Sequence, residues 1–121
     1  MDQKTFYKNL KLFLKELVVV FPENDDELQI ITTSINLAII ENDQTILKNF
    51  YSSLKKLEEF IYRRDDTLFK SDPSVYWDTS SYEYQLFTKL HTNWDTFSSH
   101  NKKIIWDYIQ VLYTISLKCC N

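Results

Sequence analysis

The chain of 121 residues contains no glycine, and this absence narrows its possible folds and activities more than any other feature. Phosphate-binding loops, dinucleotide-binding loops and nucleophile elbows need a residue that adopts a positive φ or lets a ligand approach the backbone closely. Tight hairpins between β-strands also depend on glycine, although Asn and Asp can replace it in a few. Helices joined by Asn, Asp and Ser loops have no such need. The composition therefore disfavours the usual nucleotide-binding folds and favours an all-α fold.

The length predicts one domain, residues 1–121, built around one hydrophobic core. Hydrophobic residues make up 44% of the chain and aromatic residues 16%, which is far more than a disordered chain contains. The net charge of −3 is too small to indicate a nucleic-acid or membrane partner. Lys8, Lys11 and Lys15 interrupt the N-terminal apolar residues, so no signal peptide is predicted and an intracellular protein is expected.

Residues 104–117, IIWDYIQVLYTISL, form the most apolar stretch. Its polar residues Asp107, Gln110 and Thr114 recur at i, i+3 and i+7, so on a helix they form one narrow stripe. A helix that is apolar on its other sides persists in water only when neighbours cover it, and this one is too short and too polar to span a bilayer. The sequence therefore predicts a compact bundle of five helices with this C-terminal helix at its centre. The other four helices are expected at residues 4–20, 28–40, 44–62 and 82–97.

The first predicted helix carries four lysines, Lys4, Lys8, Lys11 and Lys15, on the side opposite its apolar face. Such a row can bind phosphate or an acidic partner. Without arginine or interleaved aromatic residues, it is a weak nucleic-acid footprint, and an ordinary solvated face is the simpler interpretation.

The second predicted helix has no charged residue between positions 28 and 40. Leu28, Ile31 and Ile35 belong to its core stripe. Three more large apolar residues, Ile30, Leu37 and Ile40, lie off that stripe. This helix is therefore expected either to be deeply buried or to meet another chain with its second face.

Residues 71–81 form the one predicted long loop, and Tyr76 and Trp77 lie in its middle. Residues 72–83 have the twelve-residue spacing of a calcium loop, but Tyr76 and Trp77 occupy positions that need an oxygen ligand and a glycine, so calcium is not expected. The two aromatic residues are interpreted either as a lid packed on the bundle or as an exposed anchor for a partner.

Arg63, Arg64, Asp65 and Asp66 form a cluster of mixed charge at the end of the third predicted helix. The arginines are a candidate site for an anionic group. The interpretation we favour is structural, with cations at the helix C-terminus and a salt-bridged exit from the helix.

Few residues are candidates for metal binding or catalysis. Cys119 and Cys120 are adjacent and are expected to be reduced thiols, the alternative being an intermolecular disulfide or a metal clip. His91 and His100 have no Cys or carboxylate at ligand spacing. We therefore expect a non-enzymatic protein without metal or cofactor; a buried Asp107 with a strongly raised pKa in an open cleft would reopen the question.

Three segments together resemble a group of small, mostly uncharacterised proteins of nucleocytoplasmic large DNA viruses, the giant viruses and their relatives. They are VFP at 20–22, RDDTLF at 64–69, and Trp94 followed by NKKIIW-x-YIQ-x-L at 101–112. Members often have a Phe pair after the mid-chain acids, where this chain has Leu68 and Phe69. The group carries no catalytic residues to transfer. The resemblance implies an intracellular viral protein of the infected host cell cytoplasm and leaves packaging in the virion open.

These observations predict a non-enzymatic protein–protein interaction module of a large DNA virus, structural or assembly-related. Its partner is expected to be another protein or a second copy of the chain, with no membrane contact. The expected binding residues are those with apolar surface in excess of one small core, namely Ile30, Leu37, Ile40, Tyr76 and Trp77. The alternative is a nucleic-acid-binding accessory protein in viral transcription or genome packaging, which would use Lys4, Lys8, Lys11 and Lys15.

Overall fold

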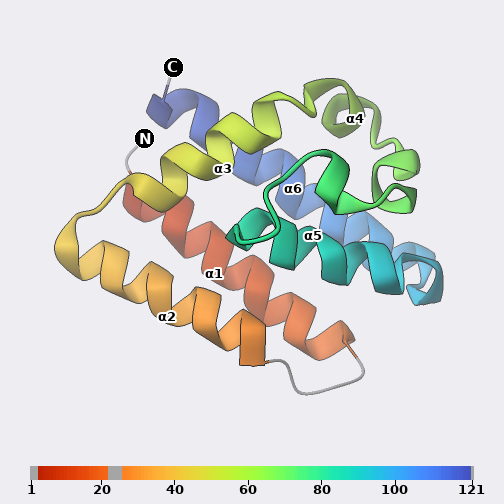
Figure 1. The fold of residues 1–121 in the computed structure, drawn as a ribbon, viewed down its shortest axis with the longest axis horizontal. Helices are drawn as coiled ribbons and strands as arrows, with labels where there is room; N and C mark the ends of the chain where they lie inside the picture. The colour runs from red at the N-terminus through yellow and green to blue at the C-terminus, as the bar shows by residue number, and fades with distance from the viewer. Residues whose placement is uncertain (1–2, 22–25, 121) are drawn as a thin grey trace.

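The computed structural model describes residues 3–21 and 26–120 of the chain. These residues form six α-helices and three short 3₁₀ helices, with no β-strand among them (Figure 1). The prediction of an all-α fold is therefore confirmed, whereas the predicted count of five helices is wrong. In chain order the elements are α1 (Gln3–Val20), α2 (Asp26–Glu41), α3 (Thr45–Lys55), α4 (Glu58–Arg63), η1 (Asp66–Lys70), η2 (Pro73–Val75), α5 (Tyr82–Asn93), η3 (Trp94–Thr96) and α6 (Ser99–Cys120).

Two helices, α1 and α6, make the most extensive contacts in the bundle. α6 packs against α1, α3 and α4, and α1 packs against α2, α3 and α6. The pair is antiparallel, since Phe13 stacks on Tyr108 at a centroid distance of 5.3 Å while the start of α1 lies beside the end of α6 (Figure 1). α5 packs against α2 and against the three 3₁₀ helices.

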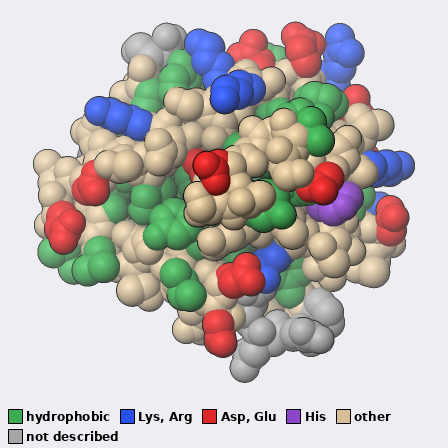
Figure 2. Space-filling model, viewed as in Figure 1, with side chains coloured by type: hydrophobic (Ala, Val, Ile, Leu, Met, Phe, Trp, Pro, Cys, Tyr) green, Lys and Arg blue, Asp and Glu red, His purple; other side chains and the backbone are tan. Residues whose placement is uncertain are grey.

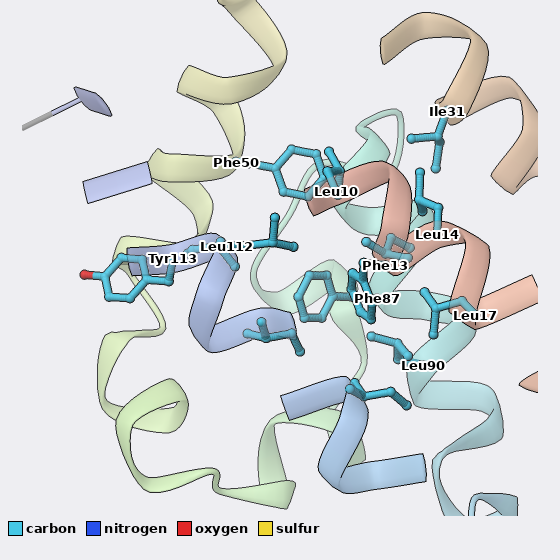
Figure 3. Close-up of a cluster of buried hydrophobic side chains, with 14 of the residues drawn as sticks. Leu10, Phe13, Leu14, Leu17, Ile31, Phe50, Phe87, Leu90, Leu112 and Tyr113 are labelled. Carbon is cyan, nitrogen blue, oxygen red and sulfur yellow. The ribbon is translucent and has the colours of Figure 1, made fainter. Parts of the chain in front are cut away.

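The core is one cluster of buried apolar side chains contributed by every α-helix. Figure 3 shows four side chains of α1, among them Leu10 and Leu14, pointing toward residues of α2, α3 and α5. Trp106 and Leu112 of α6 are buried, as the apolar character of residues 104–117 predicts. Burial of each such side chain contributes about 1.5–3 kcal/mol relative to leaving it exposed.

The third predicted helix, 44–62, is instead two helices, α3 and α4. The break lies at Leu57, whose backbone N–H donates to Leu54 O at 3.0 Å, so one i→i+4 hydrogen bond is replaced by an i→i+3 bond. Leu54, Leu57 and Ile61 are all buried. The change of direction keeps these side chains in the core, and it brings Glu58 of α4 to the hydroxyl of Tyr113 on α6, which donates a hydrogen bond to it.

Two helices end in a left-handed residue that is not glycine. Asn42 after α2 has φ 56° and Arg64 after α4 has φ 51°. In each case the next residue closes a six-residue loop, since Asp43 N donates to Ala38 O at 2.8 Å and Asp65 N donates to Phe60 O at 3.0 Å. This is the Schellman arrangement, in which glycine is the usual left-handed residue. The chain therefore forms glycine-type helix ends with Asn and Arg.

Four aspartates each stabilise a turn just before an α-helix or a 3₁₀ helix. Each accepts a hydrogen bond at Oδ1 from the backbone N–H two residues later, and that later residue is Ser or Thr in every case. Hydrogen bonds from the following Ser or Thr also hold the pKa of each carboxyl below its ordinary value. The four pairs are Asp43 with Thr45, Asp65 with Thr67, Asp72 with Ser74, and Asp78 with Ser80.

Candidate protein-interaction surface

The outward side of α2 carries a row of large apolar side chains in contact with water. Ile30 is 56% exposed, Leu37 52% and Ile40 79%. Together with Thr33 they follow the spacing 30, 33, 37 and 40, which places all four on one side of a helix. We call these four residues the α2 outer face. Figure 2 shows hydrophobic side chains gathered over the part of the molecule where α2 lies in Figure 1.

The opposite side of α2 packs in the hydrophobic core, and the α2 outer face takes no part in that core. Leu28, Ile31, Ile35 and Ala38 are buried against α1, α3 and α5. Of the two alternatives that the uncharged sequence left open, deep burial of the second face is therefore wrong for Ile30, Leu37 and Ile40. Contact of this face with another chain stays a prediction.

A groove of about 410 Å³ runs between α1 and α2 next to this face. Its apolar lining is Leu14 and Val18 from α1 and Leu28 from α2. Thr33 also lines the groove, and because Thr33 belongs to the α2 outer face, groove and outer face form one continuous surface. The rest of the lining from α2 is polar but uncharged.

The lysine row of Lys4, Lys8, Lys11 and Lys15 follows α1 on the other side of the groove. Lys4, Lys8 and Lys15 are exposed, whereas Lys11 is half-buried and its Nζ donates to Asn36 Oδ1 of α2 at 3.0 Å. Lys11 and Lys15 line the groove itself. The surface is thus apolar on the outer face of α2, polar and uncharged where α2 borders the groove, and basic along the lysine row of α1.

Trp77 does not belong to this surface, and its prediction as an exposed anchor is wrong. The side chain is only 9% exposed and its ring lies 4.5 Å, centroid to centroid, from that of Phe87 on α5. Tyr76 is half-buried against Phe60. The other interpretation, a loop lid packed on the bundle, is confirmed. Both rings pack on apolar residues of the same chain, so the loop covers the bundle with them and does not present them to a partner.

The charge cluster at the end of α4 is built into the fold. Arg64 Nη2 donates to Asp107 Oδ1 and, at 2.7 Å, to Gln110 Oε1 on α6. Gln110 Nε2 in turn donates to Ile61 O at 3.0 Å. Hydrogen bonds from Arg64 and then Lys103 hold the pKa of Asp107 below its usual range. Asp107 is therefore not the acid of raised pKa that would point to catalysis. Two residues of the polar stripe of α6, Asp107 and Gln110, instead bind Ile61 of α4 and Arg64 just after it.

One acid that sequence reasoning missed is Glu83. Its side chain is 5% exposed and lines a cleft of about 220 Å³ between α3 and α5, together with Asn49 and Ser81. Burial raises the pKa of this carboxyl, while hydrogen bonds from its own backbone N–H, from Ser81 and from Ser53 oppose the rise. Ser81 caps α5 and Glu83 lies in the first turn of that helix, where the helix dipole favours a negative charge. In the sequence, the only indication of a special role for Glu83 is its position two residues after Ser81, at the start of a predicted helix.

The cysteines and histidines considered for metal binding or catalysis lie outside this surface. Cys119 and Cys120 are half-buried side chains at the end of α6. His91 Nδ1 lies 2.7 Å from Phe69 O, a hydrogen bond that joins α5 to η1. Within the described ranges, no three His, Cys, Asp or Glu side chains are grouped so that they could hold a metal ion. The helices described in the structure include none long and apolar enough to cross a membrane.

Comparisons with protein-family models, with curated proteins and with solved structures found no match. The surface formed by the α2 outer face, the groove and the lysine row must therefore be interpreted from its own chemistry. What it offers is apolar area and positive charge side by side.

Proposed function

We propose that this protein is a non-enzymatic protein–protein interaction module that binds a partner through the α2 outer face. The observation that supports it is the exposure of Ile30, Leu37 and Ile40 on one side of a helix without charged residues between positions 28 and 40. Apolar side chains scattered singly on a surface need no explanation, but a row on one helix face marks an interaction site. Covering such a row with a partner removes apolar area from water and so contributes to binding.

The resemblance of the chain to proteins of nucleocytoplasmic large DNA viruses supplies the biological setting of this proposal. In that setting the module is structural or assembly-related and acts in the infected cell, with a viral or host protein, or a second copy of the chain, as partner. The test of the setting is an inventory by mass spectrometry of purified virus particles and infected cells.

The test of the binding function compares the proteins retained by tagged wild-type chain with those retained by two variants. Leu37→Asp places a charge in the α2 outer face, whereas Val75→Asp is a matched control on η2, where Val75 is 72% exposed. Both positions are exposed, so both variants are expected to keep the helical circular dichroism of the wild type. A partner that is retained by wild type and Val75→Asp but lost with Leu37→Asp supports the proposal.

Self-association is tested with the same variants by light scattering across a dilution series. A dimer that is lost in Leu37→Asp and kept in Val75→Asp would support binding through the α2 outer face by a second copy. A chain that stays monomeric and whose retained proteins are unchanged by Leu37→Asp overturns the proposal.

Nucleic-acid binding is the second candidate function, favoured by the exposure of Lys4, Lys8 and Lys15 along one side of α1. The same side also carries the exposed apolar residues Leu12 and Val19, which give no contact to phosphate. Binding of this kind would weaken by orders of magnitude between about 50 and 200 mM salt. A gel shift at low salt that shows no retardation of RNA or DNA removes this candidate.

A further inference from the structure

The shape of the surface suits one kind of occupant. α1 and α2 run antiparallel, since Gln3 donates to Asn42 and Lys11 donates to Asn36, and the groove between them is continuous with the α2 outer face. From Ile30 to Ile40 the outer face extends about 15 Å along the helix axis, at 1.5 Å per residue. A partner helix of about three turns covers that length, and an amphipathic helix laid in an apolar groove is a recurring mode of peptide recognition.

The charges around the groove are unequal on its two sides. Four lysines follow α1, while α2 has no charged residue from position 28 to position 40. An occupant that covers both the groove and the α2 outer face therefore meets the exposed apolar side chains of that face on one flank and positive charge on the other. An acidic flank on the occupant complements the lysine row, and a basic flank is repelled by it.

A second copy of the chain fits this pattern less well. The spacing 30, 33, 37 and 40 reads the same in both directions, so two α2 helices can in principle pack antiparallel about a two-fold axis. In such a pair the two α1 helices lie on the same side of the joined α2 helices, which brings the two lysine rows toward each other. No acid of α2 between positions 28 and 40 is available to separate them.

We propose that the occupant is an amphipathic helix of a different protein, whose apolar stripe covers the α1–α2 groove and the α2 outer face and whose acidic flank lies along Lys4, Lys8, Lys11 and Lys15. The inference rests on the proposed interaction function and specifies the partner of the same surface. In this arrangement the lysine row selects the partner by its charge, and the α2 outer face provides most of the binding affinity. Exposed charges at the rim of an interface act mainly on specificity and on the rate of association.

The experiment uses two synthetic helical peptides with the same leucine stripe, one with Glu and one with Lys along the same flank. Binding of each labelled peptide to the purified chain is measured by fluorescence anisotropy at low and high salt. The Glu-flanked peptide is expected to bind about tenfold more tightly at low salt, and the difference is expected to shrink as salt screens the charges.

Three variants separate the two parts of the surface. Lys8→Glu with Lys15→Glu reverses two exposed charges of the lysine row and is expected to invert the preference between the peptides. Lys56→Glu with Lys118→Glu makes the same change of net charge at exposed positions outside α1 and α2, and is expected to keep the preference. Leu37→Asp is expected to weaken binding of the Glu-flanked peptide at every salt concentration.

Each contrary outcome identifies which statement fails. If both peptides bind equally and Leu37→Asp weakens both, the acidic occupant is overturned while the proposed interaction face stands. If binding is insensitive to Leu37→Asp, the interaction face itself is overturned. If the Glu-flanked peptide does not bind, the inference is overturned, and a Leu37-dependent dimer in sedimentation would then assign the surface to a second copy.

Discussion

The ring of Phe69 stacks on the indole of Trp94, with 4.2 Å between their centroids. Phe69 belongs to η1, which follows the charge cluster, and Trp94 begins η3 after α5. The same phenyl ring stacks on Phe87 of α5 at 5.9 Å and lies 5.1 Å from Trp106 of α6. One side chain thus joins two 3₁₀ helices and two α-helices, and it explains how segments without regular α-helix are held on the bundle.

Replacement of Phe69 by Ala is expected to lower the free energy of unfolding by about 3–5 kcal/mol, because it removes a fully buried ring and leaves a cavity among rigid aromatic neighbours. Urea denaturation followed by circular dichroism measures the change. Val75→Ala, at an exposed position of η2, is the control and should change the value by no more than about 0.5 kcal/mol. A loss below about 1 kcal/mol for Phe69→Ala would contradict this account of the aromatic cluster.

Arg64→Ala is expected to lower the thermal unfolding midpoint more than Arg63→Ala does. Arg64 donates hydrogen bonds to Asp107 and Gln110 of α6, whereas Arg63 pairs with Glu59 on the exposed side of α4. Exposed pairs of the second kind contribute little to stability. Because Ala has a Cβ as Arg does, the left-handed backbone at position 64 is equally strained in the wild type and in Arg64→Ala. Equal midpoints for the two variants would show that the contact between α4 and α6 does not depend on this guanidinium.

Asn42→Ala is expected to be less stable than Asn42→Gly by about 1 kcal/mol. The residue has φ 56°, where a Cβ without a polar partner is unfavourable and glycine is not. Both variants lose the hydrogen bond from Gln3, so their comparison isolates the backbone term. Chemical denaturation of the pair measures it. If the two variants unfold at the same denaturant concentration, the end of α2 relaxes out of the left-handed conformation.

Glu83→Gln is expected to raise the thermal midpoint at neutral pH and to have no such effect in acid. Burial raises the pKa of Glu83, so the folded protein binds the proton more tightly than the unfolded chain. The stability that this group contributes is therefore fully present below its unfolded pKa, about 4.3, and is lost as pH rises through the folded value. Gln imitates the protonated carboxyl at every pH. Midpoints of both chains across pH measure the difference.

The turn aspartates act with the opposite sign and so serve as an internal comparison for Glu83. Hydrogen bonds from Thr67 lower the pKa of Asp65, so its contribution is present above the unfolded pKa and is lost as pH falls through the folded value. The Asp65→Asn variant is therefore expected to be less stable than wild type at neutral pH, where Asp65 is ionised, and equally stable in acid, where Asp65 is protonated. If Glu83→Gln lowered the thermal midpoint at neutral pH, as Asp65→Asn is expected to do, burial would not be the effect that dominates the pKa of Glu83.

Most helices of this protein could be predicted from the sequence because the periodicity of apolar residues is a local property. Residues 4–20 and 28–40 correspond to α1 and α2, and the burial of Trp106 and Leu112 follows from the apolar run around them. The absence of glycine correctly pointed to helices. It did not reveal that Asn42 and Arg64 would adopt the left-handed conformation in its place.

Features that depend on contacts between distant residues were decided by the tertiary structure. The break at Leu57 keeps Leu54 and Ile61 in a core formed with other helices, and no local pattern indicates it. The burial of Trp77 requires Phe87, and the burial of Glu83 requires α3 and α5 to pack together.

The candidate surface shows the same division between what is local and what is not. That Ile30, Leu37 and Ile40 lie off the core stripe of their helix follows from their spacing along the chain. That they are exposed, and that the lysine row follows the other side of the same groove, depends on how α1 and α2 pack. Helix periodicity is set by backbone geometry within a few residues, whereas the neighbour that each face meets is set by the packing of the whole chain.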